Sequence, residues 1–283
     1  MMDSNVAFIV SPPRSGSTLL QNVLGSHSKM ATLPESYIQL ALHAVVEEMD
    51  LGVPVLRWTR SALAEYLTRV SEDTYNKGMR AAANVFYQAA LEAKPSAEIF
   101  IDKVPEYFRI LPRLLGMYES SSFILLVRNP LDTLASMIRY DGVEHWPQLA
   151  LCKDRHRRGC TIDRTPEVLD SYWAIELAHR EHPSIPLVRY EDFVVEPAST
   201  AEQLCWHLGL EYESEMLNYQ QSFTMSRFQD ENSASKHERP VTTYIDYWRE
   251  FLPEESAKSY LEVLGHSTVE ALGYGYLLEE LNA

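Results

Sequence analysis

The chain has 283 residues, a formal net charge of −15 at pH 7 and a hydrophobic content of 46%. This acidity argues against nucleic acid or an anionic membrane surface as the main partner, because either would favour a basic field on the protein. No uninterrupted apolar stretch approaches the roughly 18 residues needed to cross a bilayer, so we expect no membrane partner.

The N-terminal residues lack the basic and apolar regions of a signal peptide. The three cysteines, Cys152, Cys160 and Cys205, fit a reducing compartment better than a disulfide framework. We therefore expect a cytoplasmic protein. The sequence carries no signal for its oligomeric state.

The first predicted strand, Val6–Val10, leads into the segment Ser11-Pro12-Pro13-Arg14-Ser15-Gly16-Ser17-Thr18. An amphipathic helix begins near Ser17 and ends near Gly25. Small hydroxyl residues and one glycine let backbone N–H groups converge on an anion, and the helix N-terminus adds its dipole. Arg14 adds a cation, so we predict a phosphate-binding loop formed by Arg14, Ser15, Gly16, Ser17 and Thr18.

This segment departs from the Walker A loop, G-x-x-x-x-G-K-[ST], at two points. It has no leading glycine, and no lysine follows Gly16. The anion that it holds is therefore left open by the loop alone.

The second predicted strand, Met30–Leu33, is followed by Glu35 at the same edge of the sheet. Helical patterns at Leu40–Met49 and Ala62–Val70 then favour a helical cap inserted at about residues 36–95. Inserted elements at this edge usually face the substrate.

The third and fourth predicted strands, Ile99–Ile101 and Phe123–Val127, lead to Lys103 and Arg128. Ligands of open α/β sheets gather at the carboxyl ends of the strands, so both cations are expected in the crevice beside Arg14. A P-loop kinase usually has an aspartate at such a strand end to hold Mg²⁺. An arginine there favours a second phosphate and no required metal.

Each of these charged residues also has an ordinary structural interpretation. Lys103 would form a surface pair with Asp102, and Arg128 a solvated pair with Asp132. Glu35 would be an acidic residue placed near a helix N-terminus by the helix dipole.

A last strand over Ile185–Arg189 completes an alternation of strands and helices along the chain. This alternation predicts an α/β fold with a central, mostly parallel sheet flanked by helices. We expect one P-loop-like domain over residues 1–283, with a variable segment at about 141–165 that contains the basic run 153–158.

These motifs together resemble the sulfotransferases that use 3′-phosphoadenosine 5′-phosphosulfate (PAPS). The loop at Arg14–Thr18 resembles their 5′-phosphosulfate loop, and Arg128 with Ser136 on the following helix resembles their 3′-phosphate site. Lys103 resembles the lysine that neutralises the bridging oxygen as the sulfuryl group leaves. The resemblance runs from about residue 6 to 275, and the central cap and residues 141–165 lie outside it.

The resemblance leaves two residues open as the catalytic base. The cytosolic small-molecule branch has a histidine two residues after the lysine, but this chain has Pro105. Tyrosylprotein and several bacterial sulfotransferases instead have a glutamate at the place of Glu35. His237 is the rival, in a polar segment that resembles the family's late nucleotide-contacting loop, where Lys236 and Arg239 are candidate phosphate ligands.

The resemblance implies in-line transfer of a sulfuryl group from PAPS to a hydroxyl or amine, with 3′-phosphoadenosine 5′-phosphate (PAP) as product and no metal. The net charge favours a small neutral or cationic acceptor, such as a natural product, over a polyanion. Two alternatives remain: a P-loop kinase that uses ATP and Mg²⁺ on a small hydroxyl compound, and a non-catalytic nucleotide-binding regulatory module.

Overall fold

The structure is a computed structural model that describes residues 5–43, 62–63, 65–67, 69, 71–153, 161–222 and 240–282. Its centre is a five-stranded sheet in the order β2-β3-β1-β4-β7, and every neighbouring pair of strands is parallel. The predicted parallel α/β fold is thereby confirmed. The strands are β1 (Val6–Val10), β2 (Met30–Thr32), β3 (Ile99–Lys103), β4 (Ser122–Val127) and β7 (Leu187–Arg189).

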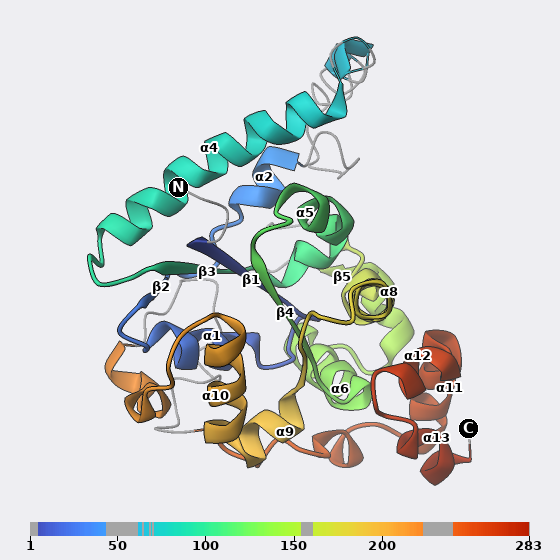
Figure 1. The fold of residues 1–283 in the computed structure, drawn as a ribbon. Coiled ribbons are helices and arrows are strands. Elements are labelled where there is room, and N and C mark those ends of the chain that lie inside the picture. The colour runs from blue at the N-terminus through green and yellow to red at the C-terminus, as the bar shows by residue number, and fades with distance from the viewer. Residues whose placement is uncertain are drawn as a thin grey trace.

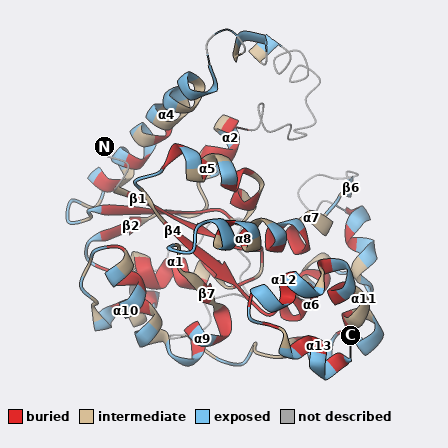
Figure 2. Ribbon diagram, turned by 45° about the vertical axis from the view of Figure 1, so that its right-hand side comes forward, coloured by how far each residue is buried: buried red, intermediate tan, exposed pale blue. Residues whose placement is uncertain are grey.

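Helices cover both faces of this sheet (Figure 1). Alternate residues of each strand enter one of two apolar clusters, because successive side chains of a strand point to opposite faces. Val6 and Phe8 belong to the larger cluster, and Ala7 and Ile9 to the smaller one. The strands are therefore buried on both sides, as Figure 2 shows, which explains their continuous apolar sequence.

The helices on the side of the larger cluster include the long α4, whose far end extends beyond the sheet (Figure 1). On the other face lie α1, α9 and α10. The helices between β1 and β7 are α1 (Ser17–Gly25), α2 (Ile38–His43), α4 (Glu72–Glu92), α5 (Leu111–Met117), α6 (Pro130–Asp141), α7 (Thr165–Val168) and α8 (Asp170–Glu181). Those after β7 are α9 (Tyr190–Val195), α10 (Pro197–His207), α11 (Glu254–Leu264), α12 (His266–Ala271) and α13 (Tyr276–Leu281).

Short 3₁₀ segments and a small ribbon join these elements. The 3₁₀ segments are Pro105–Ile110, Trp146–Leu151, Ser214–Leu217, Tyr219–Ser222 and Tyr247–Glu250, and the antiparallel ribbon pairs β5 (Cys152–Lys153) with β6 (Thr161–Ile162). Across the described part of the chain, no helix is both long enough and apolar enough to span a membrane.

The observed boundaries differ from the predicted ones at several elements. β3 continues two residues beyond the predicted Ile101, to Lys103, and α2 begins at Ile38, two residues before the predicted Leu40. Residues 44–49 of that predicted helix lie outside the described residues. The sequence pattern missed α4, which begins where the side chain of Ser71 accepts a hydrogen bond from the backbone N–H of Thr74.

The carboxyl ends of the strands meet at one edge of the sheet. Ile9 of β1 lies opposite Lys103, and Val127 of β4 lies opposite Arg189. The segments that follow the strands therefore converge at this edge, and they carry most of the predicted site residues.

Candidate active site

The loop between β1 and α1 has the backbone shape of an anion cradle. Gly16 has φ +87° and Arg14 has φ +66°, both in the left-handed region. The hydroxyl of Ser15 donates a 2.5 Å hydrogen bond to the carbonyl of Pro12, which closes the turn. A Cβ on Gly16 would lie 2.4 Å from Cδ2 of Tyr190, so only glycine fits here.

Lys103 lies between the loop and Glu35, at the edge of the sheet where the sequence predicts the crevice. Its Nζ is 2.5 Å from Oε1 of Glu35 and 3.3 Å from the hydroxyl of Thr18. The Lys103 side chain is fully buried and that of Glu35 is 12% exposed. The structure thus brings together Glu35, Lys103 and the end of the loop, and the alternative of a surface pair between Asp102 and Lys103 is wrong.

Asp102 faces the opposite side of β3 from Lys103, because strand side chains alternate. Its carboxylate accepts hydrogen bonds from Tyr87 at 2.5 Å, Tyr107 at 2.7 Å and Ser36 at 3.0 Å. Burial raises the pKa of the Asp102 carboxyl, and the hydrogen bonds from these three hydroxyls oppose that rise. No motif in the sequence indicates this cluster, although the alternation of side chains along a strand places Asp102 and Lys103 on opposite faces.

Arg128 is only 6% exposed and contacts three segments that are far apart in the chain, at Arg14, Tyr190 and Tyr244. It donates to the carbonyl of Arg14 at 3.1 Å and to that of Tyr244 at 2.6 Å. Its guanidinium lies over the ring of Tyr190, 4.8 Å from the centroid, and 3.8 Å from Asp132. The pair with Asp132 exists, but it is buried rather than solvated. Tyr190 and Tyr244 contact Arg128 but carry no motif in the sequence. Tyr190 directly follows β7, so its place at a strand end could have indicated it.

The two predicted phosphate sites form one network. The Nε of Arg14 donates to the hydroxyl of Ser136 on α6 at 3.1 Å, and the Arg14 guanidinium lies 4.9 Å from the centroid of the Tyr140 ring. The Nε of Arg128 is buried and has no hydrogen-bond partner among the described residues. A buried cationic donor without a partner is costly, so this atom fits an anionic ligand.

Asp132 anchors the segment that carries Tyr244. Its carboxylate accepts hydrogen bonds from the backbone N–H of Asp246 at 3.0 Å and of Trp248 at 2.8 Å. Burial raises the pKa of Asp132 to about 6, and the nearby Arg128 opposes this rise. Trp248 is 4% exposed and packs in the larger core cluster.

The second candidate base and its neighbours lie outside the described residues. This candidate base is His237, and its neighbours are Lys236 and Arg239. Most of the basic run 153–158 also lies outside the described residues. In the described part of the chain, no group of three or more His, Cys, Asp or Glu side chains is arranged to hold a metal ion.

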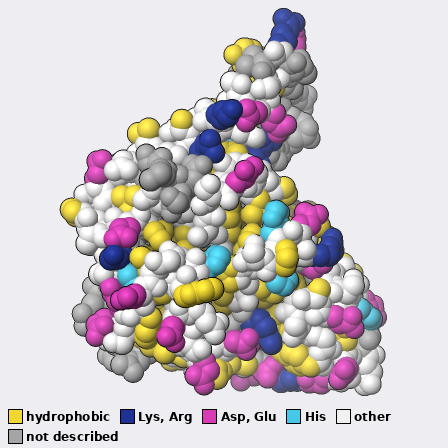
Figure 3. Space-filling view, viewed as in Figure 1, with side chains coloured by type: hydrophobic (Ala, Val, Ile, Leu, Met, Phe, Trp, Pro, Cys, Tyr) yellow, Lys and Arg dark blue, Asp and Glu magenta, His cyan; other side chains and the backbone are white. Residues whose placement is uncertain are grey.

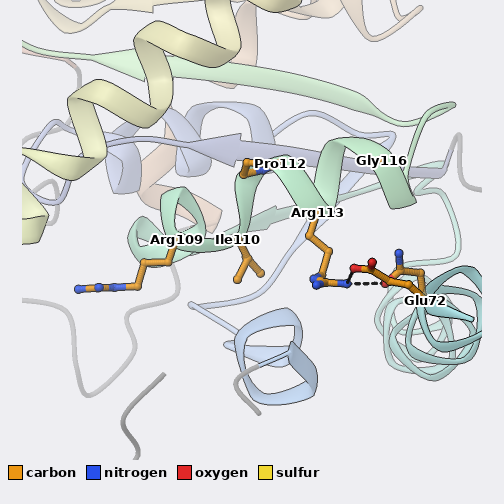
Figure 4. A pocket seen from close by; sticks show the side chains of 7 residues that line it. Glu72, Arg109, Ile110, Pro112, Arg113 and Gly116 are labelled. Carbon is orange, nitrogen blue, oxygen red and sulfur yellow. Dashed lines mark hydrogen bonds and ion pairs between the residues drawn. The ribbon is translucent and has the colours of Figure 1, made fainter. Parts of the chain in front are cut away.

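A hollow of about 420 Å³ lies elsewhere, between α4 and α5 (Figure 4). Arg113 forms an ion pair with Glu72 at 2.9 Å across it and a hydrogen bond to Asn76 at 2.8 Å. Its lining includes neither the loop nor Lys103, so it is separate from the crevice. The lining residues are Glu72, Asn76, Arg109, Ile110, Pro112, Arg113 and Gly116.

Comparison with known proteins gives a family match and a fold match. The model of the sulfotransferase family matches residues 7–214. The nodulation protein NoeE of Sinorhizobium fredii (strain NBRC 101917 / NGR234) is 25% identical over 297 residues, which cover 97% of this chain and 67% of NoeE.

Among solved structures, the sulfotransferase domain from the curacin biosynthetic pathway superposes with a TM-score of 0.58 and 21% identity, covering 95% of this chain and 98% of that one. Mouse sulfotransferase SULT7A1, complexed with PAP, gives a TM-score of 0.52 and 15% identity, covering 98% of this chain and 89% of that one. These two similarities are similarities of fold.

Proposed function

The chain belongs to the sulfotransferase family, and from this premise we propose that it transfers a sulfuryl group from PAPS to a hydroxyl or amine of a small-molecule acceptor. The observation that carries the proposal is the contact of Lys103 with both Glu35 and Thr18. A carboxylate, a buried cation and the end of an anion-binding loop meet at this point.

The proposed reaction is an in-line displacement at sulfur. The bond from sulfur to the bridging oxygen of PAPS breaks while a new bond forms from sulfur to the acceptor atom. Glu35 takes the acceptor proton, and Lys103 stabilises the negative charge that develops on the departing PAP. Positioned charges of this kind act strongly because they need no reorganisation during the reaction.

The ion pair between Lys103 and Glu35 suits this sequence of events. As Lys103 turns to the departing oxygen, the oxygen Oε1 of Glu35 is freed from this contact and can accept the proton of the acceptor. Lys103 Nζ also lies 3.3 Å from the hydroxyl of Thr18, so it is already in contact with the loop that would hold the phosphosulfate.

The residues present suit a 3′,5′-bisphosphate nucleotide. Arg14 and the backbone of Ser15–Thr18 would hold the 5′-phosphosulfate, and Arg128 and Ser136 the 3′-phosphate. The unpartnered Nε of Arg128 and the glycine required at position 16 support this assignment. SULT7A1, which shares the fold, is complexed with PAP. Lys236 and Arg239 are proposed as further phosphate ligands.

A small neutral or cationic acceptor suits the electrostatics of the chain. Its formal net charge is −15, and acidic side chains are spread over the face seen in Figure 3. A polyanionic acceptor would meet repulsion. The fold is shared with a domain of the curacin biosynthetic pathway, which supports a natural-product acceptor.

The experiment is a transfer assay with radiolabelled PAPS and a panel of small alcohols, phenols and amines. We expect labelled product with wild type and none with Glu35→Gln, while Glu35→Gln still binds PAP. His237→Ala is the matched variant, expected to keep turnover. Turnover that is kept in Glu35→Gln and lost in His237→Ala would make His237 the base. If wild type bound PAP but transferred no sulfuryl group to any compound of the panel, the regulatory-module alternative would be favoured.

A further inference from the structure

The buried carboxylate of Asp102 has no place in the proposed chemistry, yet it is held by three hydroxyl groups. The donors are Tyr87 on α4, Tyr107 on the 3₁₀ segment after β3 and Ser36. Asp102 is 2% exposed, and Tyr87 and Tyr107 are fully buried. An isolated buried carboxylate would be strongly unfavourable, so this cluster depends on all its hydrogen bonds.

The donors belong to segments that define the crevice. Ser36 follows Glu35 directly, and its hydroxyl also accepts from the backbone N–H of Ile38 at 3.3 Å, where α2 begins. Gln39 of α2 donates to Tyr87 at 2.9 Å and to Tyr118 at 2.8 Å. Hydrogen bonds of Ser36 and Gln39 thus connect the Glu35 segment to α4 and to the core, on the face of β3 opposite Lys103.

Asp102 and Lys103 are neighbours on β3, so the strand links the two sides. Lys103 reaches Glu35 in the crevice, and Asp102 reaches Ser36 on the other face. Glu35 and Ser36 are therefore held to the same two residues of one strand. A displacement of this segment would change the distance between Glu35 and Lys103.

We propose that Asp102 is a positioning residue for sulfuryl transfer: its carboxylate fixes the Glu35 segment against β3 and so sets Glu35 beside Lys103. This inference rests on the proposed function. Misplacement of a reacting group by about 1 Å costs on the order of a hundredfold in rate, so a hydrogen bond distant from the substrate is enough to affect turnover.

The test variants are Asp102→Asn and Ser36→Ala, with Ser36→Thr as the conservative variant that keeps the hydroxyl. Tyr260→Phe is the matched control, because this fully buried tyrosine donates to the carbonyl of Val168 in the core and touches no crevice residue named above. Three quantities are measured: the transfer rate to the best acceptor of the panel, the Kd for PAP and hydrogen exchange of the segment 34–40, whose exchangeable backbone amides are those of residues 35–40 because Pro34 has none.

We expect Asp102→Asn and Ser36→Ala to lower the transfer rate by about tenfold or more and to raise exchange at 34–40. The Kd for PAP should stay within about twofold of wild type, since the phosphate-binding loop is untouched. Ser36→Thr should recover most of the rate, and Tyr260→Phe should change neither the rate nor exchange at 34–40.

Unchanged exchange at 34–40 in Asp102→Asn would overturn the inference, and so would an unchanged transfer rate. In either case the proposed function stands, because wild type still turns over. A wild type that neither binds PAP nor transfers the sulfuryl group would instead overturn the proposed function, and the inference with it.

Discussion

Gly16→Ala is the substitution for which the loop geometry gives the most definite expectation. The added methyl group meets two obstacles. Gly16 has φ +87°, and the new Cβ would lie 2.4 Å from Cδ2 and 2.6 Å from Cε2 of Tyr190. Both atoms belong to a ring that packs under Arg128, so the ring cannot move without disturbing the predicted 3′-phosphate site.

The magnitude follows from these two obstacles. A non-glycine residue in the left-handed region costs about 1–2 kcal/mol. Overpacking a filled site costs about 1–3 kcal/mol more. We therefore expect Gly16→Ala to lower the free energy of unfolding by about 2–5 kcal/mol, and the Tm by about 3–8 °C for a chain of this size.

Two other glycines separate the contributions. Gly209 also has a positive φ, +73°, but a Cβ there meets no described residue within 4 Å, so Gly209→Ala measures the cost of the backbone conformation alone. Gly78 lies within α4, and a Cβ there is equally unobstructed. Because glycine weakens a helix interior, Gly78→Ala should stabilise the protein by about 0.5–1 kcal/mol.

The assays are thermal unfolding of the three variants and calorimetric binding of PAP. Gly16→Ala should be the least stable of the three and the only one to lose PAP affinity. If Gly16→Ala matched Gly209→Ala in stability and bound PAP as tightly as wild type, the close packing of Tyr190 on the loop would be refuted.

Two further predictions concern stability. Lys94 donates to the carbonyls of Gly25, His27 and Met30 at 3.3, 2.8 and 2.6 Å, so Lys94→Met should lower the free energy of unfolding, measured in urea, by about 2–4 kcal/mol. The control Lys77→Met loses an exposed ion pair with Asp73 and should change this free energy by at most about 0.5 kcal/mol. Equal effects of the two substitutions would contradict this role of Lys94. The pKa of Asp132 is about 6 in the folded protein, above its ordinary 3.8, so between these pH values the folded protein binds more protons than the unfolded chain. The stabilisation that the protonated Asp132 contributes is therefore present below about pH 4 and is lost as the pH rises through about 6. The stability of wild type relative to Asp132→Asn should therefore fall by on the order of 3 kcal/mol from pH 4 to 7, and an increase over that range would contradict the assignment.

The sequence predicted the parts of the site that follow strand ends. Strands buried on both faces read as apolar runs, so their carboxyl ends are recognisable. Arg14, Glu35 and Arg128 follow such ends, and Lys103 is the last residue of β3. The structure places these four residues at one edge of the sheet. Their roles in catalysis and binding stay predictions.

The rest depended on contacts between segments far apart in the chain. The cluster around Asp102 joins β3 to α4 and to Ser36, and no local pattern records such a pairing. α4 itself was missed because only Ala83, Tyr87 and Leu91 are buried along its 21 residues, which leaves a weak apolar stripe. The hydrogen bond from Arg128 to the carbonyl of Tyr244 joins residues 116 positions apart. Because its acceptor is a backbone oxygen, the type of residue at position 244 does not indicate it.

We propose that this site binds a 3′,5′-bisphosphate nucleotide for sulfuryl transfer. The most direct measurement is calorimetric binding of PAP against ADP and ATP, with and without Mg²⁺, for wild type and Arg128→Ala. We predict tight binding of PAP that needs no Mg²⁺ and is weakened in Arg128→Ala, and weaker binding of ADP, which lacks the 3′-phosphate. A preference for ATP with Mg²⁺ would rule out the bisphosphate site and favour a P-loop kinase.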